Sequence, residues 1–181
     1  MTTTVPQPYD YLIASIPGGQ FTGTASDHLL ELIRTQLPNG INPVINSDGI
    51  NIIITFDQDL STADKATLDT LVPHCADYFI ITKDGGRTDL GDPAVVTTAA
   101  GQQSATTITL QYKMGDGTNF ASFGEAIVVH APIMTIDKIA GNFDGNGQLQ
   151  FIIGSELKRG EVNIAIDADA LPEKILTASW S

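Results

Sequence analysis

Hydrophobic and polar residues in the first half of the chain follow two different periods. From residue 26 to residue 37 the apolar residues recur at helical spacing, and Ser26 is a favourable N-cap, so we expect a helix that begins near Ser26 and ends at residues 38–40. From Ile50 to Phe56 the apolar residues alternate, which predicts a strand that follows a tight turn at residues 47–49. The helical set is Leu29, Leu30, Ile33 and Leu37, and the alternating set is Ile50, Ile52, Ile54 and Phe56.

A second helix is expected after Ser61. Ser61 stands at its N-cap, Asp64 occupies the third helical position as an acidic variant of the capping box, and Pro73 ends the helix. With short strands at residues 11–16 and 78–82, the order strand, helix, hairpin, helix, strand predicts a small α+β module over residues 1–83. Its expected core packs Ile52, Ile54 and Phe56 under Leu29, Ile33, Leu68 and Leu71.

The second half of the chain contains strand signals alone. Segments rich in threonine, valine and isoleucine alternate with glycine turns, and residues 83–93, which contain three glycines and a proline, are expected to be the linker between two modules. Seven strands in residues 92–181 match an immunoglobulin-like β-sandwich in size and number. The predicted strands are residues 94–98, 105–112, 125–130, 134–139, 148–153, 161–167 and 175–180.

Composition limits the kinds of partner. The net charge is −12 with nine lysines and arginines in 181 residues, so the chain lacks the basic surface that binds bare nucleic acid. The longest apolar stretches are far shorter than the roughly 20 residues of a membrane-spanning helix, and the N-terminus lacks the features of a signal peptide. The single cysteine, Cys75, excludes an intrachain disulfide, which indicates folding in a reducing cytosol.

The adjacent pair His74 and Cys75 is a candidate catalytic site. A nucleophilic cysteine needs a lowered pKa and a base opposite it in space, but neighbours in sequence point apart, and the pair follows Pro73 at a helix end. Packing is therefore the favoured interpretation, and we expect no catalytic residue. His28 and His130 are distant in the sequence, so with one cysteine a zinc site lacks ligands.

Residues 144–148, with the sequence DGNGQ, resemble the start of a calcium loop. The sixth and twelfth loop positions hold Leu149 and Ser155 in place of the required glycine and acidic residue, which favours a hairpin turn. The carboxylates of residues 83–93 could bind an ion weakly, but solvated side chains are their expected state; they are Asp84, Asp89 and Asp92. We therefore expect neither metal nor cofactor. Trp180, at the end of the last predicted strand, is expected to pack into the sandwich.

Two parts of the chain resemble phage structural proteins. NFDGNGQLQFIIG at residues 142–154 and LKRGEVNIAI at residues 157–166 resemble the bacterial immunoglobulin-like domains of bacteriophage virion proteins and surface adhesins. LLELI at residues 29–33, INIIITF at residues 50–56 and LSTADKATLDTLV at residues 60–72 resemble a small module of phage structural proteins. The resemblance implies a virion protein whose sandwich is a contact surface.

These features predict a non-enzymatic phage virion component, first of all a capsid decoration protein that binds the major capsid protein or another virion protein. It would assemble into the virion in the host cytoplasm as a homo-oligomer, a trimer first and a dimer second, with residues 1–10 as an extended arm that reaches a neighbour. Neither nucleic acid nor membrane is an expected partner. The alternative is a tail-associated or adhesin-like protein that binds a host-surface glycan through aromatic residues on turns: Phe120, Phe123 and Phe143. A cysteine hydrolase using Cys75 is the enzyme alternative.

Overall fold

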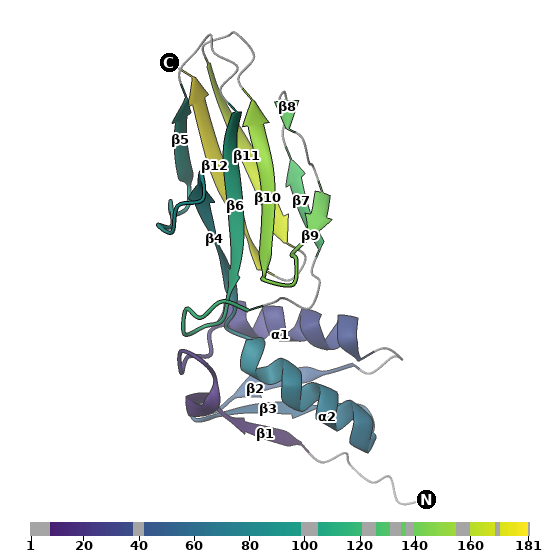
Figure 1. Cartoon of the computed structure of the whole chain (residues 1–181). Coiled ribbons are helices and arrows are strands. Elements are labelled where there is room, and N and C mark those ends of the chain that lie inside the picture. The colour runs from purple at the N-terminus through teal and green to yellow at the C-terminus, as the bar shows by residue number, and fades with distance from the viewer. Residues whose placement is uncertain are drawn as a thin grey trace, which may run out of the picture. The chain divides into compact units, whose positions relative to one another are not determined.

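The computed structural model describes residues 8–37, 42–98, 105–120, 126–130, 135–136, 140–154, 160–168 and 171–180 (Figure 1). The chain divides into two compact units. Unit 1 comprises Met1–Asp77 with Met114–Thr118, and unit 2 comprises Tyr78–Lys113 with Asn119–Ser181. The inclusion of Met114–Thr118 in unit 1 follows from close packing, because a Cβ built on Gly115 would lie 2.3 Å from the carbonyl oxygen of Pro17.

Unit 1 contains a three-stranded antiparallel sheet and two helices. In chain order its elements are β1 (Tyr9–Leu12), the 3-10 turn η1 (Ile13–Ser15), α1 (Gly23–Gln36), β2 (Val44–Ser47), β3 (Asn51–Thr55), α2 (Thr62–Leu71) and the 3-10 turn η2 (Val72–His74). The sheet order is β1-β3-β2. The strand expected at residues 11–16 is therefore wrong in position, and Tyr9 and Asp10, assigned to the arm, belong to β1 and pair with Ile54 and Ile53.

Side-chain caps set the start of both helices. Ser61 caps α2 as expected, because its Oγ accepts a hydrogen bond from the Asp64 N–H at 3.1 Å and donates one to Asp64 Oδ2 at 2.6 Å. Helix α1 begins at Gly23 rather than near Ser26, because the Thr22 hydroxyl accepts from the Ala25 N–H at 3.3 Å. Ser26, which the sequence offered as the N-cap, thus lies within the first turn of the helix.

The core of unit 1 joins one face of β3 to the apolar faces of both helices. Ile52 and Ile54 are fully buried, and Phe56 packs edge-on against Tyr9 with ring centroids 5.7 Å apart. All residues of the predicted core are buried: Leu29, Ile33, Ile52, Ile54, Phe56, Leu68 and Leu71. The alternation from Ile52 to Phe56 therefore predicted the buried face correctly, because strand side chains point to opposite faces with a period of two. Ile50, the first residue of the alternating set, is instead 66% exposed in the turn before β3.

Unit 2 consists of two sheets. One has the order β4-β6-β10-β8 and the other β5-β12-β11-β7-β9, with every pairing antiparallel except that of β5 with β12. The elements are β4 (Tyr78–Lys83), β5 (Ala94–Thr98), β6 (Ala105–Lys113), β7 (Ala126–His130), β8 (Thr135–Ile136), β9 (Ala140–Asn142), β10 (Gln148–Gly154), β11 (Gly160–Ala168) and β12 (Leu171–Trp180). Strand β9 was not predicted.

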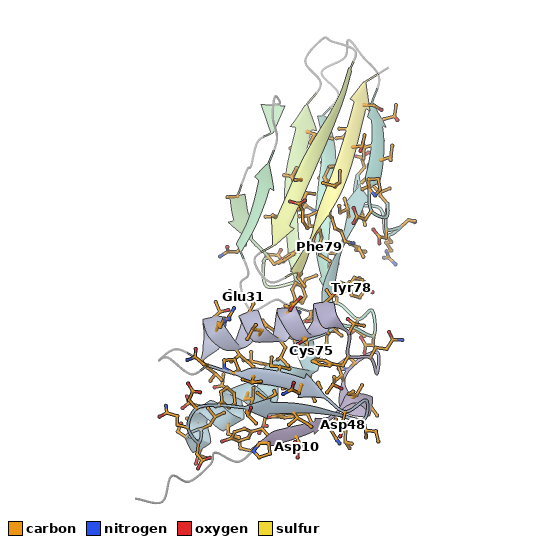
Figure 2. The ribbon with its side chains drawn as sticks, turned by 180° about the vertical axis from the view of Figure 1, so that it is seen from behind. Asp10, Glu31, Asp48, Cys75, Tyr78 and Phe79 are labelled. Carbon is orange, nitrogen blue, oxygen red and sulfur yellow. The ribbon has the colours of Figure 1, made fainter. Side chains whose placement is uncertain are left out.

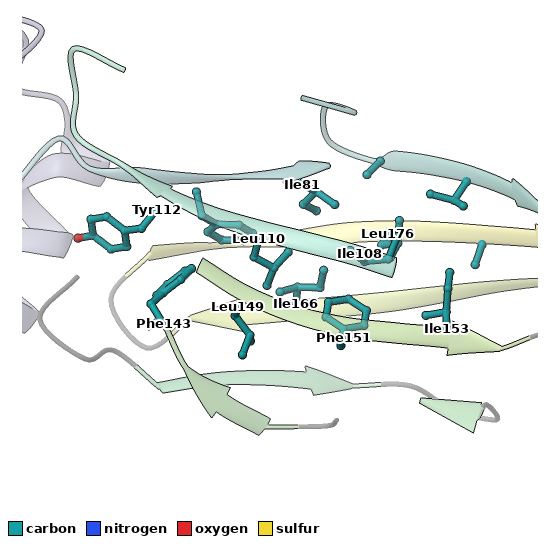
Figure 3. Close-up of a cluster of buried hydrophobic side chains, with 14 of the residues drawn as sticks. Ile81, Ile108, Leu110, Tyr112, Phe143, Leu149, Phe151, Ile153, Ile166 and Leu176 are labelled. Atoms are coloured by element: carbon teal, nitrogen blue, oxygen red, sulfur yellow. The ribbon is translucent and has the colours of Figure 1, made fainter. Parts of the chain in front are cut away.

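The two sheets enclose one hydrophobic core, so unit 2 is a β-sandwich. Residues of β4, β6 and β10 pack against residues of β11 and β12, as the labelled side chains of Figure 3 show. Its largest fully buried side chains are Tyr112, Phe79 and Phe151. Tyr112 meets Phe143 edge-to-face with ring centroids 5.3 Å apart.

The predicted boundary between the modules differs from the observed one. Strand β4 was assigned to the first module, but it pairs along its length with β6 and belongs to unit 2, so the division falls before β4 rather than after it. Residues 84–93 are not a linker between units. They connect β4 in one sheet to β5 in the other.

Candidate interaction surface

The segment after β4 covers the free edge of that strand. Asp89 Oδ1 accepts hydrogen bonds from the N–H groups of Ile81 and Gly91, and the Leu90 N–H donates to the Ile81 carbonyl at 2.9 Å. The other two aspartates of the segment also accept from backbone N–H groups, Asp84 from Thr107 and Asp92 from Ile175. A covered strand edge cannot add a further strand. These carboxylates are exposed, as the sequence predicted, and they also accept hydrogen bonds from the backbone.

His74 and Cys75 lie inside unit 1, where their contacts are structural. Burial, with a smaller contribution from the charge of Asp77, raises the pKa of the Cys75 thiol to about 12. His74 Nδ1 lies 2.8 Å from Asp77 Oδ2, and His28 Nδ1 lies 3.3 Å from the Cys75 carbonyl oxygen. A thiol with a raised pKa carries almost no thiolate at neutral pH, so the arrangement does not activate Cys75 as a nucleophile. The spacing of His74 and Asp77 within one turn was the sequence signal for this pair.

The DGNGQ segment forms the turn between β9 and β10. Asp144 Oδ1 accepts from the N–H groups of Asn146 at 2.8 Å and Gln148 at 2.9 Å, and these hydrogen bonds lower the pKa of Asp144. Gly147 has φ +71°, and a Cβ there would meet the Phe120 carbonyl oxygen at 1.8 Å. The hairpin interpretation accounts for the segment. Within the described ranges, no three histidine, cysteine or acidic side chains are grouped as a metal site would require.

Two of the three aromatic residues considered for glycan binding pack inward. Phe143 is buried, and Phe120 is partly buried against the same core with its ring centroid 6.2 Å from that of Tyr112. Phe123 lies outside the described residues, as do the side chains of His130 and Trp180. In the described part of the chain these turns therefore present no stacking platform made of Phe120 and Phe143.

The sheet of unit 1 has one face that its helices do not cover. Because Ile52 and Ile54 point into the core, their neighbours on β3 point the opposite way. The register places Ile53 between Asp10 of β1 and Asn46 of β2. We name this surface the open sheet face; it comprises Asp10, Leu12, Val44, Asn46, Asn51, Ile53 and Thr55. Figure 2 views the sheet from the side away from α2 and labels Asp10.

Apolar side chains on and beside the open sheet face are exposed. Leu12 is 56% exposed and Val44 55%, and Ile50, in the turn next to β3, is 66% exposed. The Ile13 N–H donates to the Ile50 carbonyl at 2.9 Å, which holds this turn beside the end of β1. Five large apolar residues are exposed in the described chain. Leu12 and Val44 lie in this small sheet and Ile50 lies in its β2–β3 turn; the other two are Val95 and Ile152 of unit 2.

The strand order of unit 2 defines its class. Taken in chain order as A (β4), B (β6), C (β7), D (β8), E (β10), F (β11) and G (β12), the two sheets read A-B-E-D and G-F-C. This is the arrangement of an immunoglobulin-like sandwich, with β5 added beside G and β9 beside C. The predicted class of the C-terminal half is therefore confirmed, and it was identified from strand number and spacing.

Comparisons with known proteins add no family. No protein-family model matches the chain, and no curated protein matches it. Among solved structures it is similar to WR4, a C. elegans MSP family member, at 14% identity and a TM-score of 0.39, covering 56% of this chain and 98% of that one. It is also similar to the D00-D0 domain of intimin, at 14% identity and a TM-score of 0.40, covering 80% of this chain and 64% of that one.

A third similar structure holds domains 4 and 5 of the S-layer protein SbsC, at 13% identity and a TM-score of 0.36, covering 71% of this chain and 58% of that one. These likenesses are too distant to bear on function, and the class of unit 2 rests on its strand order. Among the described residues, no helix is both long and apolar enough to cross a bilayer.

Proposed function

We propose that the chain is a non-enzymatic component of a bacteriophage virion, a capsid decoration protein that binds the head shell. The observation that carries the proposal is the open sheet face, where Leu12 and Val44 each expose more than half of their surface. The register pairs Leu12 with Asn51 and Val44 with Thr55, at opposite ends of β3, and Ile53 lies between them on the same face. Apolar side chains that share one exposed face are typical of a site that a partner covers. Together with the phage-like segments at residues 29–72 and 142–166, this surface favours a protein that works by attachment.

In this proposal unit 1 attaches to the shell, and the immunoglobulin-like unit 2 is the accessory domain. The partner is the major capsid protein or another virion protein, and the place of action is the virion, assembled in the host cytoplasm. The glycan-binding alternative is less well supported, because Phe143 is in the core of unit 2 and Phe120 packs against it.

The proposal is tested by locating the chain in purified virions. Mass spectrometry of intact particles, and of heads and tails after their separation, should find the chain in the head fraction in a constant ratio to the major capsid protein. Purified protein should also co-sediment with empty shells. Its absence from virions, or recovery with tails alone, would overturn the assignment to the head.

The proposed homo-oligomer has a separate test. Because β1 begins at Tyr9, a variant lacking residues 1–7 removes the proposed arm and spares the sheet of unit 1. If the arm reaches a neighbouring subunit, this deletion should lower the solution mass from trimer, or from dimer, toward monomer and should weaken shell binding. An unchanged mass together with unchanged binding contradicts a role for the arm.

A further inference from the structure

We propose that the open sheet face is the docking surface of this protein and that its partner is a protein surface bearing lysine or arginine around an apolar patch. This inference rests on the proposed function, since for a decoration protein that partner is the shell. It goes further in naming the face of the molecule that binds and the chemistry that the face recognises.

The charges around the open sheet face all have one sign. Asp10 lies on β1 beside Ile53, and Asp57 continues the same side of β3, where its Oδ2 accepts from Asn42 Nδ2 at 3.2 Å. Asp48 lies in the turn from β2 to β3, and backbone and side-chain hydrogen bonds from Asn51 lower its pKa together with one from Ile50, so it is charged at neutral pH. Residues 8–12 and 42–57 contain no lysine, arginine or histidine.

The basic side chains described on the helices of unit 1 lie away from this face and have acidic neighbours. Lys65 of α2 pairs with Asp69 at 2.9 Å, and Arg34 of α1 lies 3.9 Å from Glu31. Both helices pack on the side of the sheet that carries Ile52 and Ile54. The carboxylates of the open sheet face therefore have no basic counter-charge on its three strands.

This charge selects the kind of partner. Nucleic acid and anionic lipid carry dense negative charge and would be repelled. A second copy related by two-fold symmetry would bring the same patch of carboxylates against itself, because such an interface is self-complementary. A basic protein surface meets the carboxylates with opposite charge while Leu12, Val44 and Ile50 bury apolar area, which supplies both specificity and affinity.

The test compares two double variants with equal charge change. In the first, Asp10→Lys and Val44→Lys alter the open sheet face. In the matched control, Glu31→Lys replaces one carboxylate on α1, which packs on the other side of the sheet, and Val95→Lys replaces one exposed valine on β5 of unit 2. The Glu31 side chain is 43% exposed, and Val95 is 58% exposed. Asp48 is left intact, because its Oδ1 accepts from the N–H groups of Ile50 and Asn51 and shapes the turn.

Each full-length variant is mixed with separated heads and with tails, and bound protein is measured by co-sedimentation over a range of salt. We expect the wild type and the control to bind equally, the first double variant to bind at least about tenfold more weakly, and wild-type binding to weaken as salt screens the opposite charges. Circular dichroism confirms folding, and the single variants Asp10→Lys and Val44→Lys replace the double variant if it unfolds.

The outcomes separate this inference from the proposed function. If the first variant binds heads as well as the wild type does, or if both double variants bind heads equally weakly, the docking face is overturned and the decoration role stays in place. If the wild type binds only to tails, and only the first variant loses this binding, the head assignment is overturned and the docking face is supported. Tighter binding by Asp10→Lys shows an acidic partner and overturns the inference. If the first variant loses self-association but still binds heads, the face contacts a second copy, and the inference is overturned. If the wild type binds neither heads nor tails, both proposals are overturned.

Discussion

Cys75 and its neighbours illustrate how burial decides the role of single residues. The thiol is 1% exposed, and its raised pKa follows first from the loss of water around it and then from the nearby charge of Asp77. His74 contacts Asp77 and His28 contacts the backbone of Cys75, so these polar groups bind one another and the backbone at the end of α2.

The thiol of Cys75 should be unreactive in the folded protein. A pKa of about 12 in place of 9.0 reduces the thiolate fraction about 1000-fold at neutral pH, and burial also excludes the reagent. Mass spectrometry after iodoacetamide treatment should find slow alkylation of the native protein and rapid alkylation in urea. Rapid labelling of the native protein would mean that the thiol is accessible and would reopen the hydrolase alternative.

Acid should weaken the protein partly through its turn aspartates. Backbone N–H groups lower the pKa values of Asp48, Asp116 and Asp144, so each carboxylate stabilises the folded state above the ordinary aspartate value of 3.8, and this contribution is lost as pH falls through the lowered value. The variant Asp144→Asn keeps an acceptor oxygen but does not titrate. Urea unfolding should show the wild type more stable at about pH 7, with the difference shrinking at about pH 2.5. A difference that does not change with pH would contradict this origin.

At the scale of elements, side chains and loop backbone supply hydrogen bonds to the starts of helices and the edges of strands. Thr22 and Ser61 supply acceptors to the first turns of α1 and α2, and Asp89 with Leu90 occupies the open side of β4. Each of these satisfies backbone groups that a helix start or strand edge would otherwise leave without a protein partner. Strand β1 lies at the border of its sheet, and its residues Asp10 and Leu12 belong to the proposed docking surface.

Removing the cap of α2 should destabilise unit 1. In Ser61→Ala the Asp64 N–H loses its acceptor, and we expect the free energy of unfolding to fall by about 1 kcal/mol. Ser61→Asn is the matched control, since asparagine caps as well as serine and should remain within a few tenths of the wild type. Chemical denaturation measures both. Equal losses in the two variants would show that the serine hydroxyl acts through something other than capping.

For the whole molecule, the position of the boundary between units 1 and 2 determines which fragment should fold by itself. A fragment of residues 78–181 retains β4 and every strand of both sheets, so it should be soluble and give a cooperative unfolding transition. A fragment of residues 92–181 corresponds to the second module predicted from the sequence. It lacks β4 and with it the buried side chains of Phe79 and Ile81. It should aggregate or fail to unfold cooperatively, because the loss opens the core and exposes the edge of β6. A stable fragment 92–181 would support the boundary predicted from the sequence at residues 83–93.

Local patterns in the sequence were sufficient for several features. The period of apolar residues located α1, α2, β3 and most strands of unit 2, and the Ser61 cap was found because its partner Asp64 is three residues away. The turn role of Asp144 was predictable for the same reason, since its hydrogen bonds reach only residues 146 and 148. Features made by neighbours in sequence depend on backbone geometry that a short segment already determines.

Tertiary structure decided what depends on distant partners. Nothing near β4 reveals that Tyr78–Lys83 pairs with β6, that Asp92 accepts from Ile175, or that Met114–Thr118 joins unit 1. The same is true of the open sheet face: alternation showed that β3 has two faces, but only the placement of both helices on one of them leaves Leu12 and Val44 exposed together on the other. Sequence period sets which side chains share a face, and packing between distant elements sets which face meets water.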